Sequence, residues 1–211
     1  MSWGLGFLFV LWVGGVIFLR YYRVWLFYYL LGTVGCAYWL ALGVRNVWGI
    51  EPILAQSVAQ AVHLLAGLIN VPTVTFSGAP GVLLVMVVAQ EVGWTVLQVG
   101  VESSGLLEMS TLLSLVVFYP GFSLRQKAFT LFVGLLATWF ANVVRLFLIV
   151  TILNHFGKES LILAHTYLGK LVFFAFTILI YWLLITSQTL TLLRKKSTAT
   201  PTPASAPPTY D

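Results

Sequence analysis

Residues 128–153, AFTLFVGLLATWFANVVRLFLIVTIL, decide the fold, because they form one long apolar run. Arg145 is the only ionisable side chain in this run. A helix needs about 20 residues to cross a bilayer, so this stretch predicts a membrane span. A charge inside such a span is costly, and it points to a functional site by default. The search for a site therefore starts at Arg145.

Four other apolar runs resemble it: residues 3–19, 24–44, 104–120 and 161–185. The chain has 211 residues, 60% hydrophobic and 8% charged, and a mean hydropathy of +0.97. We expect an all-α integral membrane bundle with about five to six transmembrane helices. The uncertain segment is 51–70, where apolar residues at helical spacing alternate with Gln, Ser and His. It predicts an external or interfacial helix, with a sixth span as the alternative.

Residues 71–101 predict a small extracytoplasmic β segment, because Val-rich and Thr-rich runs are separated by the turn sequence SGAPG. It leads into the next apolar helix. The whole of residues 1–192 is expected to form one polytopic membrane domain. Residues 193–211, rich in Pro, Thr and Ala, predict a disordered cytoplasmic tail.

Basic residues orient this bundle. Cytoplasmic placement of the clusters at 20–23, 125–127 and 194–196 puts seven of the 11 Lys and Arg residues on one side, with the N-terminus outside. The net charge of +5 is scattered between apolar runs, which excludes a nucleic-acid-binding face. The single cysteine, Cys36, excludes an internal disulfide. With three His and few acids, we expect neither a metal nor another cofactor.

Three polar residues from different helices are expected to meet at the outer face. Ser103 lies at the start of the 104–120 helix, where free N–H groups stabilise an anion; the alternative is a helix cap by Ser103 or Ser104. Arg145 shares a helix face with Asn142; the alternative is a snorkelling arginine. His165 opens the last span and can serve as base or acid; the alternative is an interfacial histidine without a role. Together they satisfy the logic of nucleophile, base and stabiliser.

The motifs Ser103-Ser104-Gly105-Leu106, Asn142-x-x-Arg145 and His165-x-x-x-Gly169 resemble the exosortase/archaeosortase family, over roughly residues 70–186. The short chain and the acids around the first motif resemble the compact type of Gram-positive bacteria. The resemblance implies a protease and transpeptidase of the bacterial plasma membrane, with its active site on the extracytoplasmic face. Its implied partners are membrane lipids, exported proteins that carry a C-terminal sorting signal, and an envelope acceptor.

The family has a nucleophilic Cys where this chain has Ser103. The resemblance implies a nucleophile at 103, a general base and acid at His165, and substrate orientation or oxyanion stabilisation by Arg145. Glu108 is a further acid near the site, and it is expected to pair with Arg145 or to hold His165. A serine hydroxyl is much harder to deprotonate than a thiol.

Two explanations of Ser103 therefore stay open: an inactivating replacement of a native cysteine, or a natural serine variant. Two other functions remain as alternatives. One is a serine-type intramembrane protease that uses Ser103 and His165. The other is a non-catalytic membrane scaffold or transporter.

Overall fold

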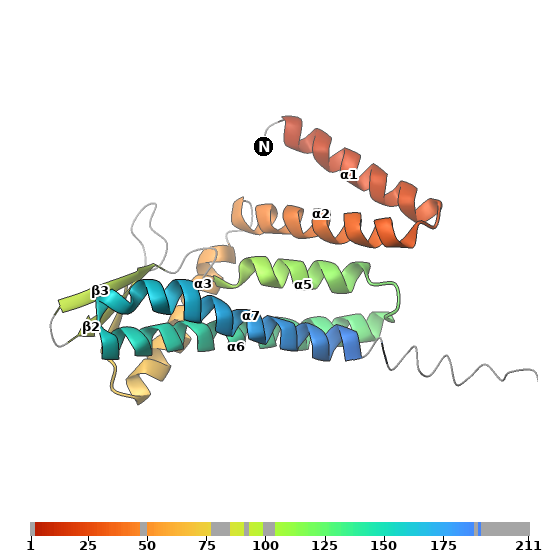
Figure 1. Cartoon of the computed structure of the whole chain (residues 1–211). Coiled ribbons are helices and arrows are strands. Elements are labelled where there is room, and N and C mark those ends of the chain that lie inside the picture. Colours follow the sequence, from red (N-terminus) through yellow and green to blue (C-terminus); the bar gives the residue numbers. More distant parts are fainter. Residues whose placement is uncertain are drawn as a thin grey trace, which may run out of the picture.

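The computed structural model describes residues 3–46, 50–76, 85–90, 93–98, 104–187 and 190. They form a mostly helical chain with one small sheet (Figure 1). The α-helices are α1 (Trp3–Tyr21), α2 (Trp25–Asn46), α3 (Ile50–Leu68), α5 (Leu106–Phe118), α6 (Leu124–Phe156) and α7 (Gly169–Tyr181). Two π-helices, η2 (Leu163–Leu168) and η3 (Trp182–Thr186), flank α7. A 3-10 turn, η1 (Lys158–Ser160), lies between α6 and the continuous helical segment that η2, α7 and η3 form.

Four helices of the described residues are long and apolar enough to cross a membrane: Gly4–Tyr21, Trp25–Val44, Leu124–Phe156 and Leu163–Thr186. α5, expected as one of five spans, is a shorter apolar helix and is not among these four. Its 13 residues rise only about 20 Å, against about 30 Å for the hydrocarbon core. The segment expected as an external or interfacial helix does form a helix, α3, and α3 is not among the four.

The long helix α6 has clear start and stop signals. The Ser123 hydroxyl accepts a hydrogen bond from the Gln126 backbone N–H, and the Gln126 side chain accepts one from the Ser123 N–H, which makes a capping box. At the other end, Gly157 has a φ of 74° and follows the last helical residue. The 33 residues between these caps span about 50 Å. The helix therefore extends well beyond the 128–153 run that hydropathy alone predicts.

One end of the bundle carries the small sheet, and we call it the sheet end (Figure 1). The strands β1 (Thr73–Phe76), β2 (Val85–Gln90) and β3 (Gly93–Gln98) pair antiparallel in that order. Thr73 pairs with Val88, and Val85 pairs with Gln98. The predicted small antiparallel sheet is thus present. Its extracytoplasmic side stays a prediction, and the predicted tail at 193–211 lies outside the described residues.

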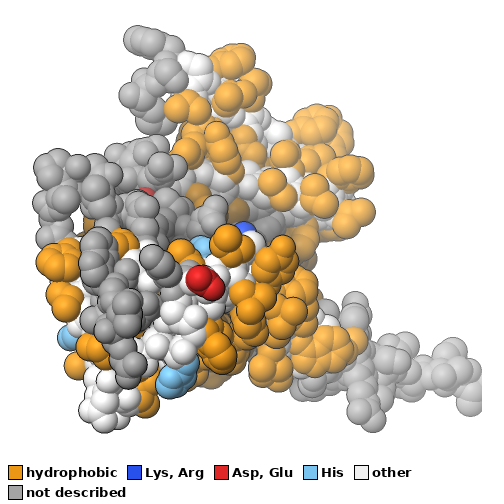
Figure 2. Space-filling view, turned by 60° about the vertical axis from the view of Figure 1, so that its left-hand side comes forward, with side chains coloured by type: hydrophobic (Ala, Val, Ile, Leu, Met, Phe, Trp, Pro, Cys, Tyr) orange, Lys and Arg blue, Asp and Glu red, His pale blue; other side chains and the backbone are white. Residues whose placement is uncertain are grey.

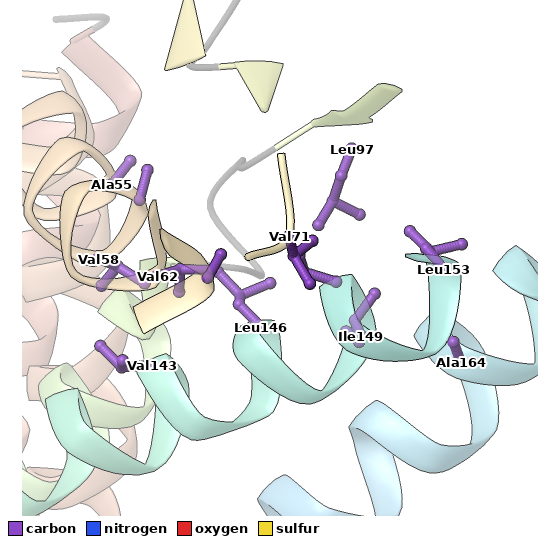
Figure 3. Packing of buried hydrophobic residues seen from close by; sticks show 13 residues of the cluster. Ala55, Val58, Val62, Val71, Leu97, Val143, Leu146, Ile149, Leu153 and Ala164 are labelled. Carbon is purple, nitrogen blue, oxygen red and sulfur yellow. The ribbon is translucent and has the colours of Figure 1, made fainter. Parts of the chain in front are cut away.

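The largest hydrophobic core of the described residues lies at the sheet end, where α3 packs on the C-terminal half of α6 (Figure 3). The small residues of α3 recur every three or four positions and are fully buried: Ala55, Val58, Ala59, Val62 and Ala66. Leu146, Ile149 and Leu153 of α6 face them and are buried just as completely. A hydrogen bond of 3.1 Å from the Trp139 indole N–H to the Ser57 hydroxyl ties the two helices together.

The N-terminal helices pack against their neighbours at glycine residues, where aromatic side chains fill the space above the backbone. α1 contacts α2 and tilts away from the other helices (Figure 1). The Trp12 indole N–H donates a 2.9 Å hydrogen bond to the Leu31 carbonyl, and its ring occupies the space that a Cβ at Gly35 would need. In the same way, Phe118 of α5 fills the gap at Gly32 of α2. These glycines let α1, α2 and α5 approach each other closely.

Candidate functional site

The start of α5 depends on a left-handed glycine. Gly105 occupies the N-cap position with a φ of 78° and a ψ of 10°, and as a glycine it contributes no side chain to the cap. The Ser104 hydroxyl accepts a 3.4 Å hydrogen bond from the backbone N–H of Leu106, the first residue of α5, as the capping alternative expects. Ser104 is fully buried. Ser103 lies outside the described residues, so its position beside this helix end stays a prediction.

Asn142 of α6 packs against this helix start. A Cβ built on Gly105 would lie 3.5 Å from the Asn142 amide nitrogen, an ordinary van der Waals contact, so the positive φ and not a lack of space favours glycine here. Asn142 has no exposed surface. Gly105 and Asn142 are 37 residues apart in the sequence (142 − 105). The two motifs that contain them are therefore direct neighbours in the fold.

Arg145 lies one turn further along α6 and is also buried, with 4% of its surface exposed. Its guanidinium carbon lies 5.4 Å from the ring centre of Phe173 on α7, which is within the range of a cation–π interaction. A snorkelling arginine keeps its charged head in water, so the buried guanidinium argues against that alternative. Asn142 and Arg145, which were expected on one helix face, are thus both buried.

His165 lies in the π-helix η2, next to the C-terminal half of α6. Ala164 beside it belongs to the core cluster with Ile149, and a Cβ built on Gly169 would lie 2.8 Å from Ile149 Cδ1. His165 is thus about two turns nearer to the sheet end than Phe173, the residue that faces Arg145. π-Helical turns occur frequently at functional sites. The structure brings His165 and Arg145 onto two packed elements, α6 and η2, while a shared reaction centre with Ser103 stays a prediction.

Glu108 and Arg145 line the same open pocket of about 710 Å³ between α5, α6 and α7. Their expected pairing is compatible with this placement. The pocket also contains two residues that the site prediction missed, Phe173 and Lys170. Their place in this pocket depends on how α7 packs against α5 and α6, which spacing along a single helix does not reveal.

Seen from the sheet end, the described surface is mainly hydrophobic, and charged side chains are few (Figure 2). Among the described residues, no three His, Cys, Asp or Glu side chains gather as a metal site would require. The polar residues of the site therefore lie in mainly hydrophobic surroundings.

No family model matches the chain, and no curated protein or solved structure matches it. The family resemblance therefore depends on the motif residues alone.

Proposed function

We propose that this chain spans a bacterial plasma membrane with its N-terminus outside, and that it is a membrane-embedded protease and transpeptidase of the exosortase/archaeosortase type. It would cleave a C-terminal sorting signal of exported proteins and transfer them to an envelope acceptor. One observation carries the proposal: Asn142 and Arg145 are buried together in an apolar helix, directly beside the start of α5. Such a pair is costly to keep without a role.

The proposed chemistry is acyl transfer through a covalent intermediate. In a chain with a thiol at position 103, the thiolate attacks the carbonyl carbon of the scissile peptide bond. Arg145 orients the substrate or balances the oxyanion that develops. His165 gives a proton to the leaving amine, so the peptide bond breaks and a thioester remains. An acceptor nucleophile then attacks the thioester, His165 takes its proton, and the thiol is released.

Ser103 decides whether the chain as written is active. A hydroxyl is deprotonated far less readily than a thiol, so a site built for a thiolate seldom activates it. We therefore propose that this chain is an inactive form of the enzyme, whether the serine replaced a native cysteine or arose naturally. Restoring the thiol should restore the chemistry.

The test is the alkylation rate of the Ser103→Cys chain in detergent, measured against pH with iodoacetamide. Mass spectrometry of the peptides separates position 103 from Cys36, which gives the background. If the site lowers the thiol pKa from about 8.5 to about 6.5, the thiolate fraction at pH 6.5 rises about 50-fold. A more acidic thiolate is a weaker nucleophile, so the net gain in rate is about sixfold.

Matched histidine variants make this test specific. His165→Ala should abolish the gain, whereas His155→Ala, an exposed histidine near the end of α6, should leave it intact. Processing of exported proteins should return in the Ser103→Cys chain and disappear again with Arg145→Ala. An introduced thiol that reacts with an ordinary pH profile whichever histidine is removed would overturn the enzyme proposal and leave the membrane scaffold as the better function.

A serine-type intramembrane protease is the second candidate, and the hydroxyl of Ser103 itself favours it. This candidate requires that the unchanged chain reacts with a serine-directed phosphonate at position 103 and that His165→Ala abolishes the reaction. An unreactive chain excludes the serine protease and leaves the thiol test unaffected.

A further inference from the structure

The pocket beside Arg145 combines positive charge with an apolar wall. It opens between α5, α6 and α7 and has a volume of about 710 Å³. Besides Glu108, Arg145 and Lys170, its lining consists of Leu and Phe side chains and one Thr. A pocket of this size and composition suits a ligand with a small polar head and an apolar body.

The charges in this pocket favour an anion. Two cations, Arg145 and Lys170, face one acid, Glu108, so the lining carries one net positive charge. Arg145 is buried, whereas Lys170 is exposed in the first turn of α7. Within the part of the chain that the structure describes, the Lys170 ammonium makes no hydrogen bond or ion pair. It is therefore the cation that is available to an incoming ligand.

The apolar wall of the pocket faces away from the bundle. Leu171 and Phe174 line the pocket, and they remain 67% and 66% exposed. They belong to the helical rod Leu163–Thr186, which is apolar enough to cross a membrane. In a bilayer these side chains would contact acyl chains, so the pocket opens sideways into lipid instead of only toward water.

The level of the pocket along α6 matches that of lipid phosphates. Arg145 is 17 positions beyond Ala128, where the apolar run that follows Arg125 and Lys127 begins, which corresponds to a rise of about 26 Å. The hydrocarbon core is about 30 Å thick. With Ala128 at one boundary of the core, Arg145 and the neighbouring Lys170 lie close to the other, where phosphate groups and acyl chains meet.

From these observations we infer that the pocket binds an anionic phospholipid. The phosphate lies against Lys170, with Arg145 behind it, and an acyl chain follows Leu171 and Phe174. Basic pockets between membrane helices bind such head groups in the same way. The inference rests on the membrane placement in the proposed function but not on the catalytic role of Ser103, His165 or Arg145.

The test uses the full chain, purified in detergent and stripped of lipid, and measures binding by native mass spectrometry and by the melting temperature. Phosphatidylglycerol is the probe, and phosphatidylcholine is the uncharged comparison. Lys170→Gln should weaken phosphatidylglycerol binding about fivefold, the effect of one basic residue near the lipid surface. Lys170→Arg should retain it. The matched control is Arg125→Gln, which removes an exposed positive charge at the opposite end of α6 and should change binding less than about twofold.

Three results would overturn the inference. Equal binding of the two lipids would show that the lipid charge plays no role. Equal losses of phosphatidylglycerol binding for Lys170→Gln and Arg125→Gln would show only a general attraction between basic residues and anionic lipid. An excess of inorganic phosphate that stabilises the chain as much as the lipid does indicates an anion site without lipid. Because Ser103 is unchanged in every variant, these results are distinguishable from a failure of the thiol test.

Discussion

The pair Arg145–Phe173 gives a quantitative test of the site geometry. The guanidinium carbon lies 5.4 Å from the ring centre, and the two side chains are only 4% and 8% exposed. Cation–π pairs contribute about 0.5–1 kcal/mol when exposed and about 2 kcal/mol when desolvated. We therefore expect Arg145→Met and Phe173→Leu to be non-additive, with a coupling free energy of about 1–2 kcal/mol.

The assay is a double-mutant cycle on the free energy of unfolding. The unchanged chain, the two single variants and the double variant are titrated from a mild detergent into a denaturing one, and helix content is followed. The cycle cancels what each substitution does alone, including the loss of apolar contacts at position 173. What remains is the interaction between the two side chains.

Phe174→Leu is the matched control for this cycle. Phe174 is the next residue of α7 and lines the same pocket, but it is 66% exposed and does not face the guanidinium. Its coupling to Arg145 should be close to zero. A coupling below about 0.5 kcal/mol for Phe173, or equal couplings for the two phenylalanines, would refute the assigned geometry.

Two further predictions concern packing. Gly35→Ala should destabilise the chain by about 1–3 kcal/mol, because the new methyl group overlaps the Trp12 ring. The control Gly43→Ala should be neutral, because nothing lies within 4 Å of its Cβ. Equal effects of the two substitutions in the same unfolding titration would contradict the close packing at Gly35. Ile149→Ala should cost about 2–5 kcal/mol, because Ile149 is fully buried in the sheet-end core. A loss below about 1 kcal/mol in that titration would show that this core is not formed in solution.

Hydropathy and spacing predicted the helices well, but not how long they are. The run 128–153 predicted α6 because its side chains are apolar, whereas its ends depend on hydrogen bonds to the capping residues Ser123, Gln126 and Gly157. The run 104–120 predicted α5, and the helix begins instead after the left-handed Gly105 and ends at Phe118, so it is shorter than that run. Helix ends are decided by local backbone geometry, to which average hydropathy is insensitive.

The candidate site was predicted in part. Asn142 and Arg145 follow from helical periodicity on a single helix, and the structure buries both of them. Phe173 was missed, because its contact with Arg145 depends on how α7 packs against α6. A sequence without homologous chains for comparison contains no direct information on such inter-helix pairs. The role of Ser103 depends on the same kind of tertiary contact and stays a prediction.

The unbroken course of α6 limits how this molecule can open. No proline and no π-helical turn interrupts Leu124–Phe156, so Arg145 and the sheet-end core are fixed to one stiff rod. A straight helix of this kind transmits a displacement of its sheet-end tip directly to the buried charge. The compliant joints lie elsewhere, at the glycine before α5 and in the π-helical turns that flank α7. A molecule that enters between the helices would therefore displace α5 or α7 and leave α6 in place.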